Sequence, residues 1–232
     1  MHEAAYAGVV ALTAGIFIIL SIGLHRRDTA TAVNAGVSIV AVVLPLTLGF
    51  GPVPPSGQPV DIDPALPLWI AAAGFLHSLG MVGLYEQIWW WDHLTHTLSA
   101  AFIAAVIYAS LVVVGTHSSA LNLSATATGM VTVLGTLWIG VFWEIIELVA
   151  REVGERFDIE PILVHYGWRD TAYDLCFDVV GATLVVLVDF RLFVPITSQS
   201  PEIAETLLLA TLVVTTIGSL VMAVGLGFVQ RR

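Results

Sequence analysis

Long apolar segments separated by shorter polar ones dominate the pattern of this chain. Seven runs are each long enough to cross a hydrocarbon layer of about 30 Å as an α-helix. Backbone groups in lipid must be hydrogen-bonded within the structure, so such runs predict helices. The pattern predicts an all-α fold, a polytopic transmembrane helix bundle in a single domain over residues 1–232, with spans at 4–24, 33–50, 65–84, 93–114, 129–150, 171–194 and 204–229.

The arginines predict how these spans are oriented, because basic residues are retained on the cytoplasmic side of a membrane. With seven spans, only Arg191 falls on the outer side. This distribution predicts an outer N-terminus, a cytoplasmic C-terminus and a multipass protein of the plasma membrane. The arginines on the cytoplasmic side are Arg26, Arg27, Arg151, Arg156, Arg169, Arg231 and Arg232.

Composition narrows the class of protein further. Hydrophobic residues make up 57% of the chain and charged residues 11%, which excludes an ordinary soluble domain and makes the lipid bilayer the main partner. The net charge is −10 and lysine is absent, which argues against a nucleic-acid partner. Acidic, lysine-free loops are also what we expect of a protein from a high-salt habitat.

Two kinds of connecting segment are predicted. Residues 51–64, rich in proline and glycine, and residues 115–128 are expected to be outer loops. Residues 151–170 are charged at first and then aromatic, and we expect them to form a cytoplasmic cap or an interfacial segment.

Ionisable residues gather at the predicted cytoplasmic ends of three spans. The tryptophans Trp89–Trp91, typical of a membrane interface, precede the first group. Spacings of three and four residues place the members of each group on one helix face. The groups are Asp92, His93 and His96; Glu144 and Glu147; and Asp170, Asp174 and Asp178.

Ionised groups facing lipid cost several kcal/mol, so the three groups are expected to face one another. Gathered carboxylates repel, and they need protons or a cation to coexist. Imidazole with carboxylate is a ligand set for Zn, Mn or Fe. The predicted ligands of a divalent metal are Asp92, His93, His96, Glu144, Glu147, Asp170, Asp174 and Asp178.

His77, in the middle of the third span, either adds to this site or is a hydrogen-bonded core residue.

The motifs WDHLTH, WEIIE and GWRDTAYDLCFDVVGA together resemble the YjdF-like group of inner-membrane proteins, and their order is similar to the VanZ-like set. The resemblance covers roughly residues 65–190. It implies one shared polar site in a motif-bearing core at 65–194, the third to sixth spans.

Three functions are compatible with this site. In a metal-dependent hydrolase or lipid-modifying enzyme, acting on a lipid or peptide, Glu144 or Glu147 would be the general base and Arg151 or Arg169 would steady an anionic head group. In a proton- or cation-coupled transport or sensing protein, a polar path should continue to the outer face. In a purely structural network, Arg151 would pair with Glu147.

Overall fold

The computed structural model describes residues 2–48, 50, 57, 59–117, 123–159, 161–163 and 166–229, and within them the chain is helical without strands, which confirms the all-α prediction. Half of the predicted outer loop at 51–64 lies outside the described residues, as do Arg231 and Arg232 and part of the loop at 115–128. The elements are α1 (His2–Arg26), α2 (Thr29–Leu48), α3 (Ala65–Leu79), the π-helical turn η1 (Gly80–Leu84), α4 (Tyr85–Gln87), α5 (Trp91–His117), α6 (Ala125–Phe157), α7 (Trp168–Leu187), α8 (Val194–Thr197) and α9 (Pro201–Val229).

Six helical segments of the described chain are long and apolar enough to cross a membrane: α1, α2, α3 with its extension to Gln87, α5, α6 and α9. The helix α7 is not among them. It carries Asp170, Asp174 and Asp178, which lower its apolar character although it is 20 residues long. The finding supports a protein with several membrane-spanning helices.

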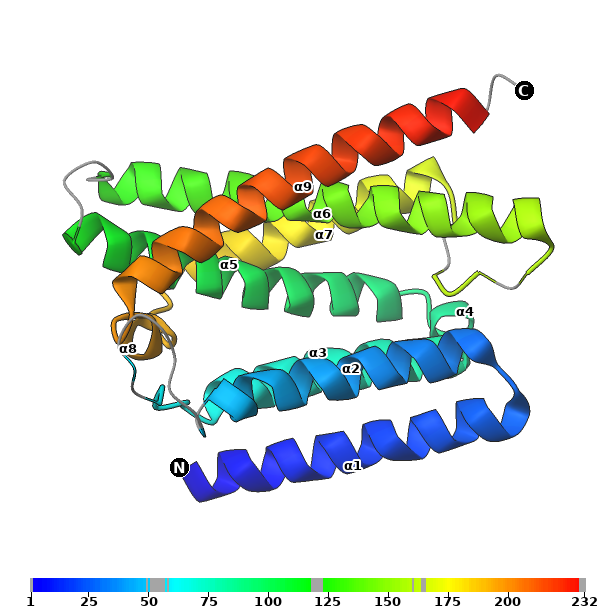
Figure 1. The fold of residues 1–232 in the computed structure, drawn as a ribbon, viewed down its shortest axis with the longest axis horizontal. Helices are drawn as coiled ribbons and strands as arrows, with labels where there is room; N and C mark the ends of the chain where they lie inside the picture. The colour runs from blue at the N-terminus through cyan, green and yellow to red at the C-terminus, as the bar shows by residue number, and fades with distance from the viewer. Residues whose placement is uncertain are drawn as a thin grey trace.

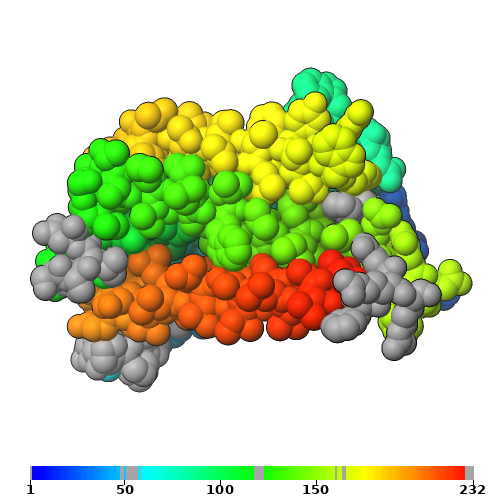
Figure 2. Space-filling model, turned by 90° about the horizontal axis from the view of Figure 1, so that it is seen from above, coloured from blue at the N-terminus to red at the C-terminus, as the bar shows by residue number. Residues whose placement is uncertain are grey.

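The long helices lie roughly side by side, and successive ones run in opposite directions, with the two chain ends at opposite ends of the bundle (Figure 1). Helices α1, α2 and α3 pack against one another, while α5 packs against α6, α7 and α9. Contacts between α3 and α5 join the two groups. Figure 2 shows α7, α6 and α9 side by side on one face of the second group.

The predicted span at 65–84 is interrupted near its C-terminal end. The α-helix ends at Leu79 and continues as the π-helical turn η1, in which Gly83 has a φ of 128°. L-residues with a side chain avoid this region, so the glycine permits the break. The break turns the chain and brings Tyr85 back beside α3, where its ring lies 5.8 Å from that of His77.

The predicted span at 171–194 was wrong at its end, because α7 stops at Leu187. Asp189 follows in the left-handed region, with a φ of 50°, which aspartate tolerates better than most residues. Its carboxylate accepts hydrogen bonds from Arg191 Nε at 2.8 Å and from the Tyr108 hydroxyl at 2.6 Å. These bonds hold the pKa of Asp189 below its usual range, and Asp189 forms an ion pair with Arg191.

Helix α6 is longer than the predicted span at 129–150. Its 33 residues extend about 50 Å, more than the hydrocarbon layer requires. Residues 151–157, expected to belong to a cap, are therefore the last turns of this helix. Leu163, in the segment that connects α6 to α7, is buried.

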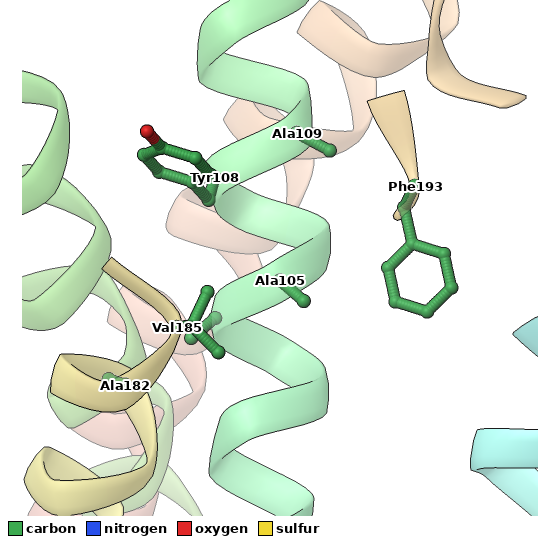
Figure 3. Close-up of a cluster of buried hydrophobic side chains, with 7 residues drawn as sticks. Ala105, Tyr108, Ala109, Ala182, Val185 and Phe193 are labelled. Carbon is green, nitrogen blue, oxygen red and sulfur yellow. The ribbon is translucent and has the colours of Figure 1, made fainter. Parts of the chain in front are cut away.

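Helices α5 and α7, which carry two of the three groups of ionisable residues, pack closely against each other. Ala105 and Ala109 of α5 point toward Phe193, while Ala182 and Val185 of α7 lie on the other side of α5 (Figure 3). At Gly181 an added Cβ would collide with the carbonyl oxygen of Thr97 and lie 3.0 Å from the backbone nitrogen of Ala101. The two helix backbones therefore touch at this point.

We expect Gly181→Ala to destabilise the protein by roughly 1–3 kcal/mol, because the methyl group meets backbone atoms that cannot move without separating the helices. Gly225→Ala is the matched control, since a Cβ there meets nothing within 4 Å. Thermal unfolding in detergent, followed by intrinsic fluorescence, measures both. Equal midpoints for Gly181→Ala and the parent protein would contradict the close packing.

Candidate functional site

The close packing of α5 on α7 brings the histidines of one helix against the aspartates of the other. His93 Nδ1 and His96 Nε2 each lie 3.9 Å from Asp174 Oδ1. The His93 ring also stacks on Phe177 of α7, with ring centroids 4.4 Å apart. Asp174 is 2% exposed, and its Oδ1 atom has no hydrogen-bond partner among the described residues. A buried carboxylate thus lies between two imidazoles.

The two nitrogens of His96 face different carboxylates. Nδ1 lies 3.2 Å from Asp178 Oδ1, within hydrogen-bond distance, while Nε2 lies 3.9 Å from Asp92 Oδ1. If Nδ1–H donates to Asp178, the neutral ring presents the lone pair of Nε2 toward Asp92 and Asp174. Carboxylates orient metal-binding histidines in this way. Asp178, predicted as a ligand, is therefore placed to orient His96.

Asp92, His96 and Asp174 each offer one donor atom, and these atoms lie within 4.8 Å of one another. A zinc ion with bonds of about 2.0–2.2 Å would hold its ligand atoms about 3.3–3.6 Å apart, so these atoms would have to move together by up to about 1.5 Å to bind one. His93 Nδ1 is buried without a hydrogen-bond partner among the described residues and lies beside the same Asp174 oxygen. The donor set and the unpaired atoms fit a divalent metal.

The carboxylates of α6 lie near the same cluster, which α5 and α7 otherwise form. Gly140 packs directly against Asp178 Oδ2, and Glu144 follows one helical turn later on the same face. Glu144 is 5% exposed, and neither of its oxygens has a hydrogen-bond partner among the described residues. Glu147 accepts a hydrogen bond from Trp143 Nε1 at 2.8 Å. The three predicted groups therefore converge.

The structure does not bring Arg151 to this site. Its guanidinium forms an ion pair with Glu155, at 2.9 Å, in place of the pair with Glu147 expected for a structural network. Arg169 lies over the ring of Trp168, 5.5 Å from its centroid. Neither arginine lines the cavity beside the cluster, so neither is placed to steady a bound head group there.

A cavity of about 410 Å³ adjoins the cluster, between the α1–α3 group and the α5–α7 pair with α6. Asp92, His96, Glu147, Asp170 and Asp178 line its polar end. Tyr166 lies there too, and burial raises the pKa of its hydroxyl, which keeps the proton available for donation. Side chains that could contact a ligand thus surround the proposed donor atoms.

His77 belongs to a hydrogen-bonded network at the cavity wall and not to the cluster itself. Its Nδ1 lies 2.7 Å from the Tyr85 hydroxyl, and its Nε2 lies 3.1 Å from Asn34 Oδ1. The Asn34 amide nitrogen donates to the carbonyl of Ile162, at 2.6 Å, and so ties α2 to the segment after α6. The sequence interpretation missed Asn34, although it is the only amide side chain in the predicted span at 33–50.

No polar path leads from the cluster along the hydroxyl groups deeper in the described helices. Thr132 and Thr136 of α6 and Ser110 of α5 are buried, but each hydroxyl donates to the carbonyl one turn earlier in its own helix. The deeper cavity walls are mainly apolar, as at Ile70 and Ile103. The site thus has a polar end and an apolar end.

The fold and this site define a class: helical multipass membrane proteins with a buried cluster of histidines and carboxylates. The chain matches a family model described as "Predicted membrane protein (DUF2238)" over residues 7–194. Because the match covers most of the chain and the whole site, the protein belongs to this family.

No curated protein and no solved structure matches the chain. The family match confirms the expected membrane-protein class. It does not extend to the YjdF-like and VanZ-like groups, so that similarity stays a resemblance in the motifs.

Proposed function

We propose that this protein binds one divalent transition-metal ion, Zn, Mn or Fe, and uses it to hydrolyse a membrane-resident substrate. The observation that carries the proposal is the convergence of Asp92, His96 and Asp174 within 4.8 Å beside the cavity. A cation would balance carboxylates that have no arginine partner in the described structure. His93, whose Nδ1 lies 3.9 Å from Asp174 Oδ1, is a further donor, and Asp178 orients His96.

We also propose that α7 is a seventh span and that the site faces the cytoplasm. The 20 residues of α7 cover about 30 Å, enough to cross the hydrocarbon layer, and its acids lie against α5 instead of lipid. The C-terminal ends of α1 and α6 and the N-terminal end of α7 lie at the same end of the bundle (Figure 1). These helix ends carry Arg26, Arg151 and Arg169, which supports an outer N-terminus and a cytoplasmic C-terminus in the plasma membrane.

In the proposed reaction, Glu147 is the general base, because its carboxylate lines the cavity. A bound metal would supply a water of lowered pKa and polarise the substrate carbonyl. Glu147 would accept a proton from the attacking water and return it to the leaving oxygen or nitrogen as the acyl C–O or C–N bond breaks. Glu144 does not line the cavity, and its buried carboxylate would help to balance the positive charge of the metal ion.

Transport is the weaker alternative for this geometry. A proton or cation path should continue beyond the cluster, but the hydroxyls of Thr132, Thr136 and Ser110 are bonded within their own helices. A site with one polar end is better suited to holding a substrate than to passing an ion across the membrane.

We expect near-stoichiometric Zn, Mn or Fe in the protein purified in detergent, measured by elemental mass spectrometry. Asp174→Asn and His96→Gln should lose most of it, because each removes a donor of the proposed centre. Asp189→Asn, outside the site, is the control and should retain the parent's metal content. If the folded parent binds no metal after incubation with these ions, the proposed centre does not exist.

Glu147→Gln should retain the metal yet slow hydrolysis of long-chain esters and amides by about 10²–10⁴-fold, the usual contribution of a general base. Glu155→Gln is the matched control on the same helix, since Glu155 is exposed and paired with Arg151. Release of the free acid is measured by chromatography. Parent-like rates in Glu147→Gln would remove this residue from the mechanism.

A further inference from the structure

The cavity is larger than a metal centre alone requires. Its volume of about 410 Å³ is in the range of pockets that enclose small organic ligands. Beyond the polar end the walls are built from apolar side chains of four helices. They include Val37 and Ala41 of α2, Ile70 and Ala73 of α3, Ile103 of α5 and Ile139 of α6.

The apolar end of the cavity opens sideways. Helices α2 and α6 both contribute lining residues, but along the described chain they do not pack extensively against each other. Val37 lines the cavity and is also 62% exposed. Because α2 is one of the candidate membrane spans, its exposed apolar side faces lipid. A hydrocarbon chain therefore has a route from the bilayer to the cavity between α2 and α6.

The polar end selects against anionic head groups. Asp92, Glu147, Asp170 and Asp178 line it, and no arginine lines it among the described residues. The chain has no lysine. Phosphate groups in proteins are typically bound by arginine or lysine. One divalent cation would balance only two of these four carboxylates, so the remaining negative charge repels an anionic head group. Uncharged hydrogen-bond donors and acceptors are present instead, at Tyr85, Thr95, Ser99 and Tyr166.

We infer that the cavity binds a single-chain amphiphile with an uncharged head group, such as the fatty-acyl ester of a neutral polyol, whose chain enters from the membrane between α2 and α6. The inference rests on the proposed hydrolytic centre, because that centre would act on the carbonyl of the bound ester. Water adds across the acyl C–O bond, so the products are a fatty acid and a neutral alcohol.

Photo-crosslinking in phosphatidylcholine vesicles tests this inference. The probes share one acyl chain with a terminal diazirine and differ only in the head group: a monoacylglycerol, a lysophosphatidic acid and a long-chain amine. Mass spectrometry locates the labelled peptides. We expect the monoacylglycerol to label the cavity-lining peptides of α2, α3 and α6 at least tenfold more than the lysophosphatidic acid does.

Two variants place a larger side chain at the lateral opening without altering the polar cluster. Val37→Trp and Ala41→Trp each add bulk at exposed, cavity-lining positions of α2, and both should reduce labelling by the monoacylglycerol at least fivefold. Val43→Trp is the control, because Val43 is exposed on α2 but does not line the cavity. It should label like the parent.

Preferential labelling by the anionic probe or by the amine overturns the inference, and so does labelling that survives in both entrance variants while they remain folded in thermal unfolding. Elemental analysis of the same samples separates this inference from the proposed function. Selective labelling without bound metal supports the amphiphile site and rejects the metal centre. Bound metal without selective labelling supports the metal centre and rejects the amphiphile site.

Discussion

Carboxylates and imidazoles that lie within a membrane-embedded bundle must face one another, and the close packing of α5 on α7 makes this possible. At Gly181 the backbones of the two helices meet, which sets the distance between the histidines and the aspartates farther along the pair. A Cβ atom at position 181 would push the two helices apart. It would therefore lengthen the distances of 3.9 Å from His93 Nδ1 and His96 Nε2 to Asp174 Oδ1. The geometry of the cluster therefore depends on a backbone contact within about two helical turns of it.

The same packing explains why the cluster needs a counterion. Asp174 and Glu144 are buried without hydrogen-bond partners among the described residues, and the nearby arginine of α6 is paired with Glu155 at the surface. Unpaired buried carboxylates are costly, so they are expected to share protons or hold a cation. His96, with one nitrogen facing Asp178 and the other facing two further carboxylates, is oriented for the second of these solutions.

Much of this arrangement could be predicted from the sequence. Apolar runs predicted the all-helical fold, and spacings of three and four residues placed the ionisable groups on shared helix faces, where the structure has them. The roles of individual residues could not be predicted this way. Asp178 and Arg151 were assigned by charge and spacing alone, whereas their roles depend on which neighbour each side chain contacts.

The interruption at Gly83 and the end of α7 were also missed, because both depend on backbone conformations and long-range bonds that an apolar run does not reveal. The Gly83 turn matters most, since it places Tyr85 beside His77. Asn34 shows a different limit. Its amide side chain is evident in the predicted span at 33–50, but its link to His77 and Ile162 depends on tertiary contacts.

The cavity extends from the cluster of histidines and carboxylates to apolar side chains of the candidate membrane spans. Its polar end holds the candidate ligands and its apolar end lies between helices that also face lipid, so the site is suited to a molecule with both kinds of surface. The absence of lining arginines in the described structure changes the substrate expected from sequence. An anionic head group, for which Arg151 or Arg169 was the expected partner, is replaced by an uncharged one.

X-ray absorption spectroscopy at the zinc edge of the zinc-loaded protein tests the central claim most directly. The account predicts a shell of only nitrogen and oxygen atoms at about 2.0–2.2 Å, with outer-shell scattering from an imidazole that weakens in His96→Gln. A sulfur shell at about 2.3 Å, or a shell of water oxygens unchanged in that variant, would contradict it.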